Sequence, residues 1–79
     1  MDYGSYLTEP IDFLKMIIGS KVYVKCKDNI ELEGELKGYD EHSNILLYKA
    51  IETNINENSK RTFDTTFIRG DFVILISRL

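Results

Sequence analysis

Two polar turns carry the side chains of this sequence that could do chemistry, and they lie at residues 40–44 and 69–71. His42 is an imidazole that can stack on a nucleobase. Asn44 offers one acceptor and two donors on a planar amide, which matches the alternating donor and acceptor edge of uracil. Arg69 carries a flat cation that stacks on the opposite face of a base or meets phosphate. If the two turns meet in the fold, they form one pocket for a base.

Three further residues of these turns have supporting roles in this interpretation. Gly70 lets backbone N–H groups come close to a ligand. Asp40 and Asp71 are acidic, so we expect them to orient Asn44 and the turn backbone rather than to touch phosphate. Each composition is also common in turns that bind nothing, so only the combination of the two turns indicates a pocket.

Catalysis is a weaker interpretation of the same residues. Asp40, Glu41 and His42 include acid and base groups, but no nucleophile lies at a supporting spacing. The chain has one histidine and one cysteine, Cys26, so it can form neither a zinc cluster nor an internal disulfide. We therefore expect no enzyme activity, no metal and no cofactor. Residues 69–71 also match an adhesion tripeptide, which does not suit a chain that we expect to be intracellular.

The composition favours one small domain that gains stability from assembly. A chain of 79 residues has room for a single marginal core, and neither disulfides nor metal can support it. A net charge of −3 argues against a broad basic surface for nucleic acid, but it leaves room for a pocket that holds a few exposed bases. No apolar run reaches bilayer length and the first residues lack the order of a signal peptide, so we expect no membrane association.

The elements that position the turns begin with a short helix. We expect residues 1–8 to be a flexible arm and residues 9–79 to be a single domain. Within that domain the spacing predicts a helix over residues 10–18, because Pro10 suits a first turn and Gly19 is a stop signal. The predicted apolar face of this helix comprises Phe13, Leu14, Ile17 and Ile18.

After the helix the period changes to two, which predicts strands. Val22, Val24 and Cys26 alternate with polar residues, and the pair at residues 28–29 is a turn signal for a hairpin. The next strand, residues 30–38, places Gly34 and Gly38 on its inner face. Glycines inside a strand mark a bend or a close backbone approach, and strong bending suits a small barrel.

The second half of the chain continues the same pattern. We expect a strand over residues 45–55, a polar loop over 54–61, a strand over 62–68, a tight turn and an apolar strand over 72–76. One short helix and five consecutive strands predict a mainly β protein, an antiparallel meander that closes into a small open barrel.

The last strand is apolar on both faces, and an exposed apolar edge invites aggregation. We therefore expect the fourth and fifth strands to pair with neighbouring subunits, and head-to-tail pairing closes into a ring. The expected subunit interface comprises Thr65, Thr66, Phe67, Ile68, Phe72, Val73, Ile74 and Leu75.

Together these residues resemble the Sm and Sm-like (LSm) family of RNA-binding proteins. The first Sm motif matches residues 22–47, with Gly34, the turn at 40–44 and Leu47, and the second motif matches residues 67–76. Both motifs in this order, inside the expected strand pattern, are specific. Within the family the closest likeness is to the eukaryotic paralogue numbered three. It rests on residues 9–12, 22–25, 31–34, 39–44 and 67–71.

The resemblance implies the Sm fold, a helix on a strongly bent SH3-like barrel of five strands. It implies that His42 stacks on uridine, Asn44 reads its edge and Arg69 closes the pocket, with backbone contact from Gly70. It also implies a non-catalytic subunit of a heteroheptameric ring that binds uridine-rich single-stranded RNA. Such rings act in the nucleus on U6 small nuclear RNA in splicing, and in the cytoplasm in messenger RNA decapping and decay.

Three alternatives stay open. The barrel could serve as a protein-interaction adaptor that binds no RNA, or as an Sm-type core subunit of a different small nuclear ribonucleoprotein. The isolated chain could also assemble with copies of itself rather than with different subunits.

Overall fold

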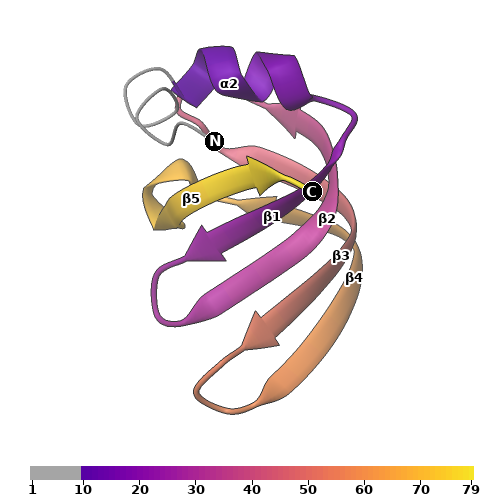
Figure 1. The fold of residues 1–79 in the computed structure, drawn as a ribbon, viewed down its shortest axis with the longest axis vertical. Coiled ribbons are helices and arrows are strands. Elements are labelled where there is room, and N and C mark those ends of the chain that lie inside the picture. Colours follow the sequence, from indigo (N-terminus) through magenta and orange to yellow (C-terminus); the bar gives the residue numbers. More distant parts are fainter. Residues whose placement is uncertain (1–9) are drawn as a thin grey trace.

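The computed structural model describes residues 10–79, so the arm expected at residues 1–8 lies outside the described part. The chain forms a short helix and five antiparallel strands in a bent open sheet, which confirms the predicted fold class (Figure 1). In chain order the elements are α2 (Pro10–Ile17), β1 (Lys21–Cys26), β2 (Ile30–Tyr39), β3 (Ile45–Asn54), β4 (Ser59–Ile68), the 3-10 turn η1 (Gly70–Phe72) and β5 (Val73–Arg78).

Helix α2 lies across one end of the curled sheet (Figure 1). Leu14 and Ile17 are buried in the core, as their helical spacing requires. The helix ends at Ile17, one residue before the expected end, because Gly19 turns the chain with φ +87°. Ile18 was expected on the packed face and is instead exposed, since it follows the last helical residue.

The β1–β2 hairpin shows how side chains of β1 enter the core. Val22, Val24 and Cys26 are fully buried, in agreement with their alternation. Asp28 and Asn29 both have positive φ, which is the backbone of a tight two-residue hairpin turn. Burial raises the pKa of the Cys26 thiol to about 11, so this cysteine is a core residue with little thiolate at neutral pH.

Two irregularities in the pairing of β2 with β3 bend the sheet, and each lies at a glycine. At Gly34 the neighbouring strand comes so close that an added Cβ would lie 3.0 Å from the Tyr48 carbonyl oxygen and 3.1 Å from Ala50 Cα. At Gly38 an added Cβ would meet only Leu46 side-chain atoms, at 3.7 Å or more. Both glycines mark bends, but only Gly34 is required by a close backbone approach.

The polar stretch at residues 54–61 is not the loop that its composition predicted. β3 runs to Asn54 and β4 starts at Ser59, so only residues 55–58 form the turn. Glu52 and Arg61 are cross-strand partners, and Arg61 donates a 2.8 Å hydrogen bond to the Glu52 carboxylate. Ladder pairing across a tight hairpin outweighs the polar composition of these residues.

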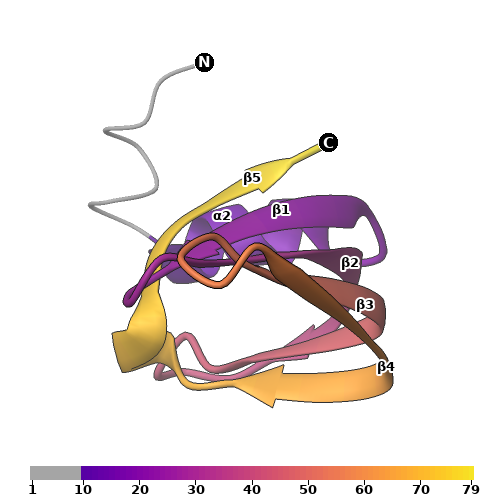
Figure 2. The ribbon, with the colours of Figure 1, turned by 90° about the horizontal axis from the view of Figure 1, so that it is seen from below.

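The sheet order is β4-β3-β2-β1-β5, so β4 and β5 are its two edges. Figure 2 shows the sheet curling round from one edge to the other, with η1 joining them. Phe72 was expected in the last strand but belongs to η1, where its carbonyl accepts a hydrogen bond from Lys27 N–H. The core inside the curl contains Leu14, Ile17, Val22, Val24, Cys26, Leu32, Leu36, Ile45, Leu47, Ala50, Ile68 and Ile76.

Gly34 and Gly38 allow a matched test of whether the close approach of the β3 backbone requires glycine. Gly34→Ala must push the backbone of β3 away, so we expect it to lower the free energy of unfolding by about 1–3 kcal/mol. Gly38→Ala has room for its methyl group, so we expect a change of less than about 0.5 kcal/mol. Urea unfolding of both variants measures the two effects, and equal losses would contradict the proposed role of Gly34.

Candidate nucleic-acid interface

The two polar turns meet in the fold. Gly70 N–H donates a 2.7 Å hydrogen bond to Asn44 Oδ1, although these residues are 26 positions apart. Gly70 lies against the backbone of the first turn so closely that an added Cβ would collide with the His42 carbonyl oxygen. Position 70 therefore requires glycine, and the expectation that the turns come together is met by this contact.

Asp40 braces the first turn from within. Its Oδ1 accepts hydrogen bonds from the backbone N–H groups of His42 (2.9 Å) and Asn44 (3.0 Å), and its Oδ2 accepts from Asn44 Nδ2 (2.8 Å). The donation from the Asn44 side chain, followed by the two backbone donors, holds the pKa of Asp40 below its ordinary value. The turn also closes through Ser43, whose N–H donates to the Asp40 carbonyl and whose φ is +61°.

The amide of Asn44 is fixed in one orientation by these contacts. Nδ2 faces the Asp40 carboxylate and Oδ1 faces Gly70 N–H, so a flipped amide would oppose donor to donor and acceptor to acceptor. One N–H of Nδ2 and one lone pair of Oδ1 remain beyond these bonds. An amide held in this way can offer one donor and one acceptor to the edge of a base.

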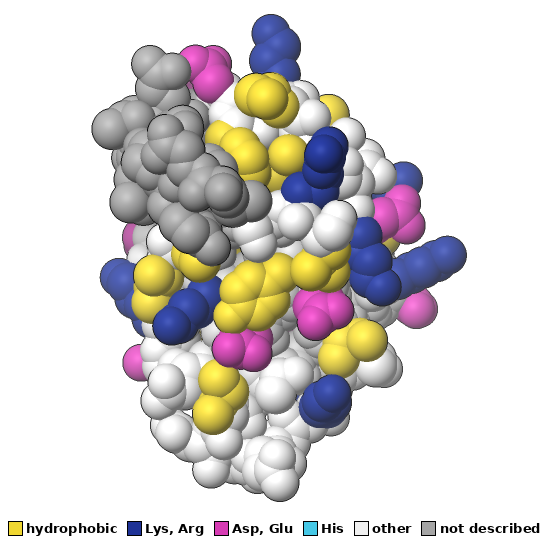
Figure 3. Space-filling view, viewed as in Figure 1, with side chains coloured by type: hydrophobic (Ala, Val, Ile, Leu, Met, Phe, Trp, Pro, Cys, Tyr) yellow, Lys and Arg dark blue, Asp and Glu magenta, His cyan; other side chains and the backbone are white. Residues whose placement is uncertain are grey.

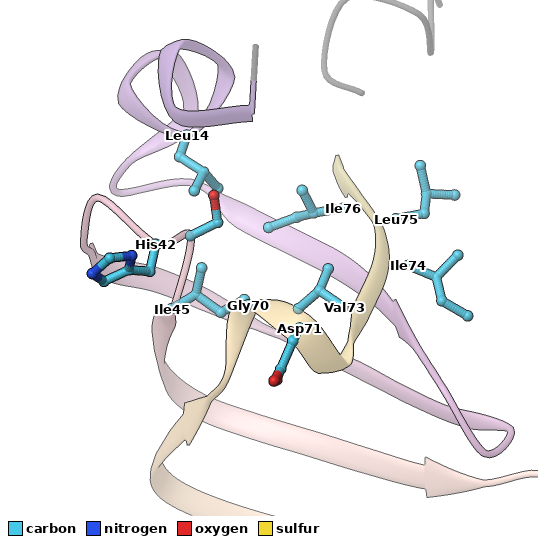
Figure 4. A pocket seen from close by; sticks show the side chains of 10 residues that line it. Leu14, His42, Ile45, Gly70, Asp71, Val73, Ile74, Leu75 and Ile76 are labelled. Atoms are coloured by element: carbon cyan, nitrogen blue, oxygen red, sulfur yellow. The ribbon is translucent and has the colours of Figure 1, made fainter. Parts of the chain in front are cut away.

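The side chains of His42 and Arg69 are each 75 % exposed, and the Asp71 side chain beside Arg69 is 67 % exposed. The imidazole lies 3.5 Å from the Glu41 carboxylate and points away from the neighbouring hollow (Figure 4). Arg69 donates a 3.0 Å hydrogen bond to Asp71, so this carboxylate contacts the guanidinium rather than Asn44. Asp40, His42, Asn44 and Gly70 thus form one cluster, and Arg69 and Asp71 form a pair beside it.

A hollow of about 430 Å³ adjoins the cluster on its apolar side. Leu14, Ile45, Val73 and Ile76 point into it from α2, β3 and β5 (Figure 4). The sequence interpretation did not include Leu14 and Ile76 near the site. Their spacing indicated core positions, but not that these positions adjoin the turns.

The residues expected in the subunit interface differ in how exposed their side chains are. Ile68 is buried in the core, so only its backbone is available at the β4 edge. Phe67 on β4 and Ile74 on β5 are large apolar side chains that are 61 % and 50 % exposed. Figure 3 shows hydrophobic side chains gathered across the middle of the face that carries β5. Among residues 10–79, both sheet edges thus combine backbone that no other strand pairs with and exposed apolar side chains.

Two negative observations apply to residues 10–79. No group of three or more His, Cys, Asp or Glu side chains there could hold a metal ion. Within the same range, no helix is long and apolar enough to span a membrane.

Comparison with known proteins agrees with this geometry. Residues 12–78 match the LSM domain family. The chain is 35 % identical to the Sm-like protein LSM3B of Arabidopsis thaliana over 81 residues, covering 87 % of this chain and 83 % of that protein. This similarity confirms the resemblance inferred from the two motifs.

Solved structures extend the likeness to three dimensions. A Pyrococcus abyssi Sm protein in complex with a uridine heptamer superposes with a TM-score of 0.79 at 34 % identity, covering 90 % of this chain and 99 % of that chain. A heptameric archaeal Sm protein superposes with a TM-score of 0.74 at 35 % identity, covering 86 % and 97 %.

The hydrogen bonds that the Asp40 carboxylate accepts within the first turn should depend on pH. A carboxylate whose pKa is lowered in the fold contributes above its ordinary pKa, and its contribution is lost as the pH falls through the lowered value. The short hydrogen bond to Asn44 should shift the Gly70 amide proton downfield in NMR spectra. We expect this shift to persist from neutral pH down to about pH 4 and to decline below it.

Asp40→Asn supplies the matching variant, because it keeps the shape but puts a donor opposite Asn44 Nδ2. We expect the downfield Gly70 resonance to be lost already at neutral pH. Asp71→Asn leaves the brace intact and is the control. An unchanged Gly70 resonance in Asp40→Asn would show that the carboxylate does not orient Asn44.

Proposed function

Because the chain belongs to the Sm and Sm-like (LSM domain) family, we propose that it is a non-catalytic subunit of a ring that binds uridine-rich single-stranded RNA. The observation that supports this proposal is the hydrogen bond from Gly70 N–H to Asn44 Oδ1, which connects the two turns. Asn44 and Gly70 hold His42 and Arg69 at one exposed site, with a fixed amide beside them. Stacking and edge hydrogen bonds suit unpaired bases, and they need little net positive charge.

Each residue of the site has a distinct role in this proposal. His42 stacks on the base, Asn44 reads its edge with the remaining donor and acceptor, and Arg69 covers the other side or meets phosphate. Asp40 and Asp71 position Asn44 and Arg69, respectively. Gly70 uses its N–H for Asn44 and its carbonyl for Val73 N–H, so its contribution is the close packing of the two turns.

The cellular role proposed for this subunit follows its likeness to LSM3B. We propose a heteroheptamer that binds uridine-rich 3′ ends, on U6 small nuclear RNA in pre-mRNA splicing and on messenger RNA in decapping and decay. This role requires the protein in both the nucleus and the cytoplasm. Residues 9–79 would then act as a single domain, and neither metal nor cofactor is needed for binding.

Ring closure in this proposal depends on the two free edges of the sheet. β4 of one subunit pairs with β5 of the next, and exposed Phe67 and Ile74 become covered when the strands join. A homodimeric contact would leave one edge of each subunit exposed, whereas a closed ring leaves none.

Base binding is tested by removing the stacking groups in the assembled ring. We expect His42→Ala and Arg69→Ala each to weaken oligouridylate binding by about tenfold, since stacking contributes about 1–3 kcal/mol per base. Lys60→Ala removes an exposed cation in the distant hairpin and is the control. Fluorescence titration measures affinity, with oligocytidylate as the competitor sequence. Unchanged affinity in both site variants, or equal affinity for the two oligomers, would refute the pocket.

The edge contact is tested by a pair of equally exposed isoleucines. Ile74 on β5 and Ile55 in the β3–β4 turn are both 50 % exposed. We expect Ile74→Arg to convert rings to smaller species in native mass spectrometry, because a charge would be buried in the contact. Ile55→Arg should leave the rings intact. Rings that survive Ile74→Arg would argue against this edge as the interface.

A further inference from the structure

Each planar side chain of the candidate pocket has a carboxylate as its direct neighbour. The His42 imidazole lies 3.5 Å from the Glu41 carboxylate, and the Arg69 guanidinium donates a 3.0 Å hydrogen bond to Asp71. All four side chains are at least 67 % exposed, so neither carboxylate is there to neutralise a buried charge. Pairs this exposed add little to stability, and their consequence is for what the pocket attracts.

Carboxylates outnumber cations in the two turns that form the pocket. With the histidine counted as neutral, residues 40–44 and 69–71 contain one cation, Arg69, and three carboxylates, those of Asp40, Glu41 and Asp71. The 3.0 Å contact between Arg69 and Asp71 is far shorter than the screening length of about 8 Å at physiological salt. Asp71 therefore offsets the positive charge that the guanidinium would otherwise present to a phosphate.

The backbone donors of the two turns are also occupied. Successive N–H groups of a turn commonly bind phosphate, but here they have partners within the protein. The N–H groups of His42 and Asn44 donate to the Asp40 carboxylate. Ser43 N–H donates to the Asp40 carbonyl, and Gly70 N–H donates to Asn44 Oδ1. These four N–H groups thus leave no site for an anion.

We propose that Glu41 and Asp71 are specificity-determining residues, which make the pocket select unpaired bases and disfavour phosphate. This inference rests on the proposed function and decides between the two roles open to Arg69. A carboxylate accepts hydrogen bonds but donates none, so it repels a phosphate oxygen. Asp71 uses the N–H edge of the guanidinium, and the flat face stays free to stack on a base. The RNA is then held through its bases, and its affinity depends only weakly on salt.

Salt dependence separates the two ways of holding RNA. The probes are an oligouridylate and an abasic oligomer of the same length and charge, each titrated against the assembled ring over a series of salt concentrations. Each phosphate neutralised on a single strand contributes about −0.7 to the slope of log affinity against log salt. For the unmodified ring we expect a much shallower slope for each nucleotide bound. We also expect the abasic oligomer to bind at least about tenfold more weakly than oligouridylate.

The variants then locate this selectivity on the protein. Asp71→Asn keeps the shape and removes the charge beside Arg69, so the freed guanidinium can form a charge-assisted hydrogen bond to phosphate. We expect this variant to bind the abasic oligomer about tenfold more tightly, with a slope steeper by about 0.7 for each occupied pocket. Glu41→Gln should act in the same direction but less strongly, because an imidazole is not a permanent cation.

Glu57→Gln is the matched control, since it makes the same change of charge in the turn between β3 and β4. We expect it to leave both the affinity for the abasic oligomer and the slope unchanged. Native mass spectrometry confirms that the rings of each variant are intact. Glu41→Gln decides the matter if Asp71→Asn disturbs the ring.

Four results would overturn the proposal. The first is a slope near −0.7 for each nucleotide bound to the unmodified ring, and the second is an unchanged abasic affinity and slope in intact rings of the site variants. The third is an equal change in Glu57→Gln. The fourth is a loss of oligouridylate affinity in Asp71→Asn without a gain for the abasic oligomer, which would make Asp71 only a structural support for Arg69.

Failure of the proposed function has a different outcome. In that case the unmodified ring would bind oligouridylate no better than the abasic oligomer, and His42→Ala would change neither affinity. A ring that prefers oligouridylate through His42, but whose Asp71→Asn and Glu41→Gln variants gain no affinity for the abasic oligomer, would keep the pocket and refute only the role of the two carboxylates.

Discussion

The hydrogen bond from Gly70 N–H to Asn44 Oδ1 is the contact on which the candidate site depends. It joins the turn between β2 and β3 to the turn that separates the two edge strands. Breaking it would leave a half-buried N–H without a partner, which costs about 1–3 kcal/mol. The bond forms only because position 70 has no side chain, since a Cβ would meet the His42 carbonyl. The Asn44 amide and the lack of a side chain at Gly70 thus hold together the two turns that carry His42 and Arg69.

The curl of the sheet makes this contact possible. Gly34 admits the backbone of β3 at Tyr48 and Ala50, and the resulting bend lets the sheet fold back over one core. The same curvature leaves β4 and β5 as separate edges that η1 connects. A flatter sheet would hold the turns apart and would expose the inner face. The bend therefore determines both the candidate site and the position of the two sheet edges.

The sequence predicted most of this framework because its periodicities are local. The alternation around Val22 and the helical spacing of Leu14 each report one buried face. The polar stretch around Ser59 was misassigned because cross-strand pairing with β3 decides its conformation, and that pairing is not local. Turn composition identified His42, Asn44 and Arg69 as candidates. Turn composition could not show that Arg69 donates a hydrogen bond to Asp71, or that the Asn44 amide oxygen accepts one from Gly70 N–H. Both contacts depend on distances in the folded chain.

The two edges of the sheet are formed by different strands, so each subunit of a ring would offer β4 to one neighbour and β5 to the other. A subunit with a damaged β5 and an intact β4 still binds the β5 of a neighbour, but it offers no partner for the next β4. Such a subunit ends a growing chain instead of being left out of it. Damage to one edge therefore acts as a chain terminator, and a minority of defective copies can keep many sound subunits from closing into rings.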